Sequence, residues 1–260
     1  GGGGGGGGGY GAISAPAVPL EFLKHPILRE TPKGNPVLTD ITMKNPTDKE
    51  KAVTIKLDGV PSGWVEEVQG VGTIPAYETK TETLAIKVPK DAEPGDYLVG
   101  MTVSLAGGIS GKSKFVLRVK DYPEEYQVPR VFTAVDVDFV NNKSSVKLSV
   151  QNNNIFRKNV FVYQTIPKSV ARRTADMDFH TAPTRIINDD PVVLWILQDI
   201  QQNQKQDLSY DVKSIVSEYE PYVYYLSNEV VAISVRQEDY VKITNVFSSP
   251  LVAGGRNNYV

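Results

Sequence analysis

Several runs between about Leu20 and residue 120 alternate apolar and polar residues with a period of two, and no stretch of this part carries a sustained helical period. Successive side chains of a β-strand point to opposite faces, so the alternation predicts strands with one buried and one solvated face. Turn-forming clusters such as Glu93–Asp96, with its Pro-Gly pair, separate the runs. The inward-facing residues of the five clearest runs are Val37, Thr39, Ile41 and Met43; Val53, Ile55 and Leu57; Leu84, Ile86 and Val88; Tyr97, Val99, Met101, Val103 and Leu105; and Phe115, Leu117 and Val119. We expect a sandwich of roughly seven strands over residues 20–121.

A second set of strand-like runs follows residues 122–129, which we interpret as a linker. Val131–Phe139 alternates as before, whereas Val192–Leu197 is apolar at every position, as expected of a strand that is covered on both faces. Pro167–Ala171 is expected to form a helical turn, with proline at or near its first position. The pattern predicts a second sandwich over residues 130–217.

Both ends of the chain extend beyond the two expected sandwiches. Residues 1–19 begin with nine glycines and continue into a Pro- and Ala-rich stretch, so we expect a flexible segment. A native spacer, an artificial glycine run and glycines that stand in for unknown residues all remain open as explanations. Residues 218–260 contain strand-like runs at 222–226, 229–235 and 240–247, which either complete the second sandwich or contact a neighbouring subunit. The predicted fold class is all-β: tandem immunoglobulin-like β-sandwiches with extended N- and C-terminal segments.

Composition excludes several classes of function. The 28 basic and 30 acidic residues nearly balance, and no local basic cluster provides the surface that a nucleic-acid-binding protein needs. The chain has no cysteine, which rules out disulfides, thiolate metal sites and cysteine nucleophiles. Its longest wholly apolar run, Val192–Leu197, is far shorter than the roughly 20 residues of a membrane-spanning helix. We expect a soluble protein without a nucleic-acid partner or a membrane span.

Two segments of the first region carry a resemblance to a known family. Leu57–Trp64 (LDGVPSGW) resembles the Gly-Leu-Pro-Gly-Trp corner of the NEW3 family, and Val88–Tyr97 (VPKDAEPGDY) resembles the Val-Pro…Pro-Gly-Asp-Tyr corner that follows it there. Order and spacing fit over about residues 20–120. The resemblance implies an immunoglobulin-fold module of the kind found on secreted bacterial and archaeal proteins, including glycosidases and envelope proteins. It therefore also implies a secreted, extracellular or cell-surface location.

The second region carries a less extensive resemblance. Ile166–Ala171 and Ile187–Trp195 make residues 130–217 similar to β-sandwich repeats of archaeal surface-layer and envelope proteins. No glycosidase domain accompanies the NEW3-like module in this chain. Neither resemblance brings catalytic residues with it.

The sequence offers no convincing catalytic, cofactor or metal site. The two histidines, His25 and His180, fall in different predicted sandwiches, and no Gly-x-Ser-x-Gly nucleophile elbow is present. Asp136 and Asp138 share a strand face and could contribute to a Ca²⁺ site, but a solvated sheet face explains them better. The remaining acidic pairs, such as Glu66-Glu67, are adjacent on a strand and point to opposite faces. We therefore predict a protein that is not an enzyme and needs no cofactor.

Three features are candidates for contact or modification. Asn142-Lys143-Ser144 is an N-glycosylation sequon in an expected turn, so Asn142 is a possible glycosylation site. Tyr222, Tyr224 and Tyr225 belong to a segment that holds four of the 13 tyrosines, and they are candidate assembly or ligand contacts. Trp64 is expected to plug the end of the first sandwich, and a sugar-stacking role is the alternative.

These observations favour two functional hypotheses. The first is a non-catalytic structural subunit or scaffold of the cell surface, in a surface layer or extracellular filament. Such a protein would form a homo-oligomer or polymer, or bind other envelope proteins, with residues 12–22 or 222–247 adding a strand to a neighbour. The alternative is a carbohydrate- or protein-binding accessory module of a secreted enzyme system.

Overall fold

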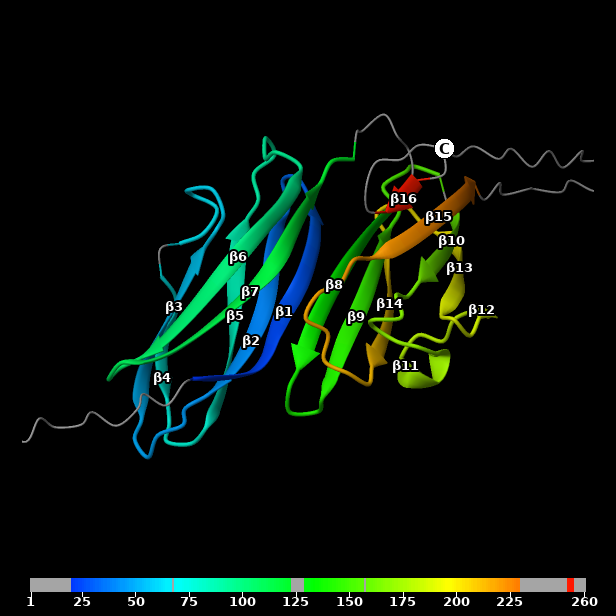
Figure 1. The fold of residues 1–260 in the computed structure, drawn as a ribbon. Coiled ribbons are helices and arrows are strands. Elements are labelled where there is room, and N and C mark those ends of the chain that lie inside the picture. Colours follow the sequence, from blue (N-terminus) through cyan, green and yellow to red (C-terminus); the bar gives the residue numbers. More distant parts are fainter. Residues whose placement is uncertain (1–19, 67, 123–128, 157, 230–251, 255–260) are drawn as a thin grey trace, which may run out of the picture.

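The computed structural model describes residues 20–66, 68–122, 129–156, 158–229 and 252–254. Nearly all of the regular secondary structure in these residues is strand, and the one short helical element is a single 3₁₀ turn at Thr174–Asp176 (Figure 1). The strands are β1 (Glu21–Pro32), β2 (Pro36–Lys44), β3 (Lys51–Asp58), β4 (Gln69–Ile74), β5 (Thr79–Lys87), β6 (Gly95–Leu105), β7 (Ile109–Lys120), β8 (Arg130–Asp138), β9 (Lys143–Gln151), β10 (Lys158–Thr165), β11 (Met177–Phe179), β12 (Arg185–Asn188), β13 (Val192–Ile200), β14 (Lys205–Val212), β15 (Tyr222–Glu229) and β16 (Val252–Gly254). The all-β sandwich prediction is confirmed.

The first sandwich packs strands β2 and β5 against strands β7, β6, β3 and β4. Alternate residues of these strands are buried, as the burial pattern of β3 shows most simply. The buried side chains form one core in which Ile41, Ile55, Leu84 and Ile86 are fully enclosed. Trp64 belongs to this core, with only 6% of its surface exposed. It therefore packs inside the first sandwich, as the sequence predicted.

Strand β1 joins the two halves of the molecule into one continuous sheet. Its first residues pair antiparallel with β2, at Phe22 opposite Met43. Its second half runs parallel to β7, at Leu28 opposite Val116, and pairs antiparallel with β8 on its other side. Figure 1 shows β1 (dark blue) lying between the first group of strands and β8 (green). The resulting path, β11-β14-β9-β8-β1-β7-β6-β3-β4, runs through both sandwiches without a break.

The second sandwich packs β8, β9, β14 and β11 against a five-stranded sheet of order β12-β13-β10-β15-β16. Its core includes Val135, Leu148, Val162, Trp195 and Tyr210, all at most 1% exposed. The helical turn expected at residues 167–171 is present, because the N–H groups of Val170 and Ala171 both donate to the Pro167 carbonyl.

The C-terminal segment contributes β15 to this sandwich. Tyr222–Glu229 pairs with β10 along its whole length, from Tyr222 opposite Thr165 to Glu229 opposite Lys158. The strand-like runs expected at residues 230–235 and 240–247, the segment 1–19, and most of the expected linker (123–128) lie outside the described residues. The domain boundaries therefore remain a prediction. Within the described ranges, no helix is long and apolar enough to cross a membrane.

Candidate functional site

The outward-facing side chains of the first sandwich are mostly polar. Lys56 of β3 lies opposite Thr102 of β6, which in turn lies opposite Lys112 of β7, and both lysines are exposed. On the other sheet, Thr83 donates a hydrogen bond to Asp40 at 2.6 Å. Sheets with one face in water normally show this polar exterior.

The outer face of the five-stranded sheet has a different composition. Tyr224 of β15 lies opposite Tyr163 of β10, which lies opposite Leu194 of β13. The same register aligns two further rows across the three strands. We call the nine residues of these rows the tyrosine face: Tyr222, Tyr224, Leu226, Phe161, Tyr163, Thr165, Val192, Leu194 and Ile196. Leu194 is only 7% exposed, so the accessible part of the face is formed mainly by β15 and β10.

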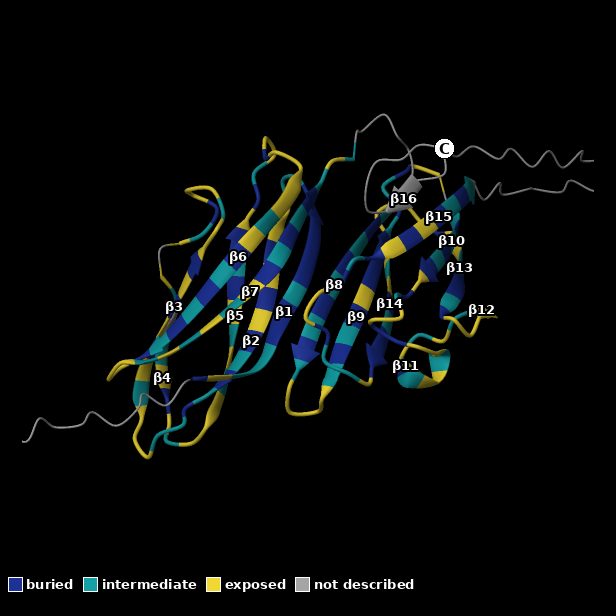
Figure 2. Cartoon of the chain, in the orientation of Figure 1, coloured by how far each residue is buried: buried dark blue, intermediate teal, exposed yellow. Residues whose placement is uncertain are grey.

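Burial confirms which residues of β15 point outward. Tyr222 and Tyr224 are 47% and 42% exposed, whereas the intervening Val223 and the following Tyr225 are each 3% exposed and belong to the core. Figure 2 shows this alternation of exposed and buried segments along β15. Tyr222 and Tyr224, predicted as contact residues from the sequence, are therefore at the surface.

Tyr225, the third predicted contact residue, points the opposite way and cannot meet a ligand on this face. Neighbouring residues of a strand alternate between faces, so Tyr224 and Tyr225 cannot both be outside. Burial raises the pKa of the Tyr225 hydroxyl, and the neighbouring Tyr122 adds to the effect. The side chain is part of the support beneath the tyrosine face.

A buried group of hydroxyls fixes the chain just before β15. The hydroxyls of Tyr210 and Tyr219 are 2.8 Å apart, and the Gln164 amide donates to the Tyr219 hydroxyl at 2.7 Å. Burial raises the pKa of both tyrosines, so they stay neutral at physiological pH. Since Gln164 lies in β10 and Tyr210 in β14, these bonds connect the two sheets directly behind the start of β15.

The first sandwich also holds the start of β15. Arg118 of β7 donates through both terminal nitrogens to Glu220, at 3.0 and 2.9 Å, two residues before Tyr222. It also makes a bidentate pair with Asp96 at 2.7 and 2.9 Å. The hydrogen bonds to these two carboxylates raise the pKa of Arg118 further above its ordinary value. The tyrosine face is thus tied to the NEW3-like half of the chain.

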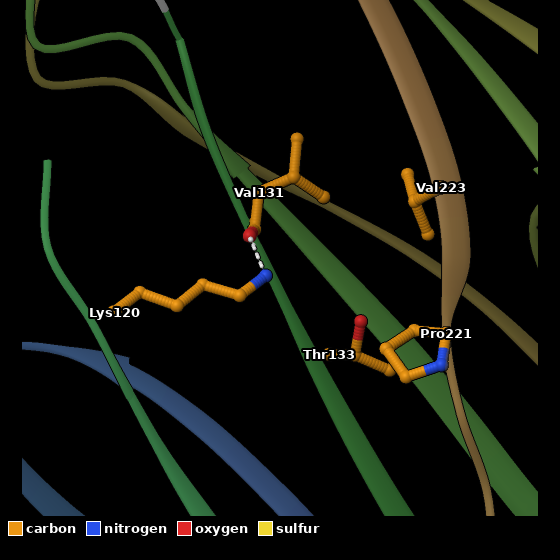
Figure 3. A pocket seen from close by; sticks show the side chains of 5 residues that line it. All are labelled: Lys120, Val131, Thr133, Pro221 and Val223. Atoms are coloured by element: carbon orange, nitrogen blue, oxygen red, sulfur yellow. Dashed lines mark hydrogen bonds between the residues drawn. The ribbon is translucent and has the colours of Figure 1, made fainter. Parts of the chain in front are cut away.

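A buried carboxylate lies at the centre of this junction. Glu30 of β1 has no exposed side-chain surface and accepts hydrogen bonds from Lys120 Nζ and from the Thr133 backbone N–H, each at 2.8 Å. Its other oxygen lies 3.6 Å from Arg118. Figure 3 shows Lys120 reaching the Val131 carbonyl between β7 and β8, in a gap also bordered by Pro221. This gap is too small to hold a ligand.

A cavity of about 370 Å³ opens at the edge of the first sandwich beside Trp64. Its lining includes Glu66 and Lys87, whose side chains are 75% and 71% exposed, and Val68. The Trp64 ring itself packs on Tyr97, with centroids 4.8 Å apart, and forms only the floor. The buried ring is not available as a stacking platform.

The remaining candidates from the sequence do not assemble into a catalytic or metal site. His25 packs between Phe22 and Phe139 with Ser113 within 3.3 Å, and burial lowers its pKa despite the Pro26 carbonyl and Asp136. His180 lies 3.1 Å from Asp211 in the second sandwich. Asp136 is engaged by Arg29 at 2.5 Å, and Asp138 by Asn141. Across the described ranges, no group of three or more His, Asp or Glu side chains is arranged to hold a metal ion.

Asn142 lies in the turn between β8 and β9, exposed and with a φ of 49°. Asparagine tolerates this left-handed conformation better than most residues, so the turn geometry alone explains why an asparagine occupies position 142. Its accessibility is compatible with glycosylation, and the modification stays a prediction.

Comparison with known proteins identifies the first sandwich. Residues 32–106 match the model of the NPCBM-associated, NEW3 domain of alpha-galactosidase. This confirms the NEW3 resemblance for that region, and the NEW3 domain is an accessory rather than a catalytic domain. The expected likeness of residues 130–217 to archaeal surface repeats finds no support in the comparisons and stays a prediction. Among curated proteins, no relative matches the chain.

Two solved structures align with parts of this chain at low identity. A family 123 glycoside hydrolase from Clostridium perfringens aligns at 14% identity over 40% of this chain and 28% of its own, with a TM-score of 0.33. The sporulation control protein Spo0M from Bacillus subtilis aligns at 10% identity over 56% of this chain and 79% of its own, with a TM-score of 0.30. This chain thus spans little more than a quarter of the hydrolase, and neither likeness is close enough to support a functional argument.

Proposed function

We propose that this chain is a non-catalytic, carbohydrate-binding accessory module of a secreted enzyme system. The observation that carries the proposal is the tyrosine face, an uncharged and partly aromatic surface on a chain whose outer faces are otherwise mostly polar. The NEW3 match over residues 32–106 supports it, because that family is described by its association with a carbohydrate-active enzyme.

The chemistry of the face suits sugars. A pyranose ring has apolar C–H faces and hydroxyl groups around its rim. Tyrosine offers an apolar ring for the former and a hydroxyl for the latter, at low cost in conformational entropy. Tyr222 and Tyr224 present both features on the outer side of β15, and their backbone is fixed by pairing with β10 and by the Arg118–Glu220 contact.

A glycan array and a pull-down on insoluble polysaccharides test the proposal. We expect the wild-type protein to bind, and the double variant Tyr222→Ser/Tyr224→Ser to bind about 30-fold more weakly if each lost stacking contact costs about 1 kcal/mol. Tyr77→Asn is a matched control, because Tyr77 is 61% exposed in the β4–β5 turn and its φ of 59° is one that asparagine accepts. Absence of wild-type binding to any glycan would contradict the proposal.

The structural-subunit hypothesis gains less from the observations. The comparisons give no support to a surface-layer or filament scaffold. One expected donor segment, residues 222–247, begins with β15, and β15 pairs with β10 of its own chain. The other expected donor segment, residues 12–22, ends at residues 21–22, which pair with β2. These residues are already engaged within the chain, so strand donation would have to use the remaining parts of both segments.

A further inference from the structure

The size of the tyrosine face limits what can bind to it. Three strands spaced about 4.8 Å apart and five residues at about 3.4 Å each give a footprint of roughly 14 by 17 Å, or about 240 Å². A stable protein–protein interface buries about 800 Å² on each partner, more than three times this area. The face alone therefore suits a narrow ligand better than a folded partner.

The charge of the face excludes ionic recognition. None of its nine side chains is charged, and among the residues that the structure describes the nearest cation in the strand register is Arg185 of β12, which lies opposite Leu194 at the border. Three tyrosine hydroxyls and that of Thr165 provide the polar groups. A ligand that matches this surface is uncharged, apolar on one side and rich in hydroxyls.

The arrangement of the rings selects the shape of the chain. Tyr222, Tyr224 and Leu226 follow one another along β15, about 7 Å apart, and Thr165, Tyr163 and Phe161 form a parallel line on β10 about 5 Å away. Two such parallel lines of side chains contact several sugar rings only if the faces of these rings lie in nearly one plane. Equatorial β-1,4 linkages keep pyranose rings in a straight ribbon, whereas α-1,4-linked chains curve.

Resting on the proposed carbohydrate-binding function, we propose that the tyrosine face binds the interior of a straight, uncharged β-1,4-linked glycan chain. In this proposal the face contacts a few consecutive sugar units and requires no chain end. Affinity therefore rises with chain length until the ligand spans the face and then changes little.

Titration calorimetry with oligosaccharide series tests this inference. The probes are cello-, manno- and chito-oligosaccharides from the disaccharide to the hexasaccharide, with the α-1,4-linked malto-oligosaccharides as the comparison series. We expect at least one β-1,4 series to gain tenfold or more in affinity from the disaccharide to the tetrasaccharide and to level off by the hexasaccharide. The malto-series should bind at least tenfold more weakly at every length.

Two variants separate this site from other surfaces. Tyr224→Ser removes the central exposed ring and should weaken hexasaccharide binding about tenfold. Leu38→Ser, at a residue that is 66% exposed on β2 of the first sandwich, should leave binding unchanged. Circular dichroism of both variants checks that the fold is retained.

The contrary outcomes are distinguishable. If Tyr224→Ser weakens binding but the protein prefers the malto-series, or its affinity does not depend on chain length, the proposed β-1,4-linked ligand is wrong and the carbohydrate-binding function stands. Glycan binding that is insensitive to Tyr224→Ser places the sugar site elsewhere on the chain and overturns the inference. No glycan binding at all, together with a dimer in sedimentation that Tyr224→Ser dissociates, overturns both proposals and makes the face a contact between copies.

Discussion

Replacing Glu30 by glutamine should destabilise the whole chain, because this carboxylate joins three strands at the junction of the sandwiches. Its side chain is fully buried and accepts hydrogen bonds from Lys120 and from the Thr133 backbone, with Arg118 nearby. In Glu30→Gln the amide oxygen can still accept the Thr133 N–H, but the negative charge between two cations is lost. The variant therefore tests the charge rather than the shape of the side chain.

The expected loss can be bounded. Removing one partner of a buried ion pair costs about 3–5 kcal/mol, because the other charge stays buried without compensation. Here Lys120 keeps 15% of its side chain exposed, and Arg118 retains Asp96 and Glu220, so we expect roughly 2–4 kcal/mol in the free energy of unfolding. For a chain of this size that corresponds to a fall in melting temperature of about 5–15 °C.

Urea unfolding followed by tryptophan fluorescence measures this loss, with Trp64 reporting on the first core and Trp195 on the second. Glu66→Gln is the matched control, because the Glu66 side chain is 75% exposed and 3.8 Å from Lys87, and it should change stability by less than about 0.5 kcal/mol. A Glu30→Gln effect no larger than the control would refute the view that the buried charge stabilises the junction.

Two further predictions concern the two sandwiches separately. In the first, Gly59 has a φ of 83° and a Cβ there would overlap the Leu98 carbonyl oxygen, so Gly59→Ala should cost at least about 2 kcal/mol. Gly63 has a similar φ of 87°, but a Cβ there would meet no other atom, so Gly63→Ala measures the backbone strain alone and should cost about 1 kcal/mol in urea unfolding. If both variants lost the same stability, the overlap of the Cβ at residue 59 with the Leu98 carbonyl oxygen would have to be relieved in the variant. In the second, burial alone would raise the pKa of Asp211, but hydrogen bonds from groups including Lys143 outweigh it and hold the pKa below 3.8. A carboxylate with a lowered pKa stabilises the folded state at pH values above the pKa of the unfolded chain, and this stabilisation is lost as the pH falls through the pKa of the folded state. Asp211→Asn should therefore lower the free energy of unfolding at pH 7 and show a smaller further loss of stability below pH 4. Parallel pH profiles of wild type and variant would contradict this.

The strand pattern of the fold was predictable because alternation reports burial directly. Residues such as Ile41, Ile55 and Leu117, predicted to face inward, are fully buried. The short strand β4 escaped prediction, since Gln69–Ile74 contains two glycines and offers too few apolar positions to show a period. The run Val192–Leu197 was expected to be covered on both faces. Trp195 does lie in the core, and Leu194 on the outer side is only 7% exposed, whereas Ile196 on the tyrosine face is partly exposed.

Strand β1 could not have been predicted from local sequence. Its residues do not alternate, because the strand leaves β2 and then lies between β7 and β8, whose residues are about 90 to 110 positions away. Arg29 and Glu30 would be assigned to the surface by composition, yet both are at most 9% exposed. Their burial depends on partners such as Lys120 and Asp136, which only the tertiary fold brings near.

The tyrosine face was only half visible in the sequence for a related reason. Tyr222 and Tyr224 stand out as a cluster, but other strands complete the surface. Phe161 and Tyr163 come from β10, which pairs with β15, and Leu194 comes from β13, which pairs with β10. Each of these is unremarkable in its own segment, and only cross-strand pairing brings them into rows.

The structure gives a physical reason for the NEW3-like sandwich and the tyrosine face to occur in one rigid unit. Strand β15 begins two residues after Glu220, which Arg118 of β7 holds through two hydrogen bonds. The other sheet of the second sandwich continues into the first through β1, so the two cores share a backbone hydrogen-bond network. An isolated second sandwich would expose the edge of β8 that now pairs with β1, and it would lose the Arg118 contact at the start of β15. A ligand on the tyrosine face would therefore have a defined orientation relative to the NEW3-like sandwich, as the proposed function requires.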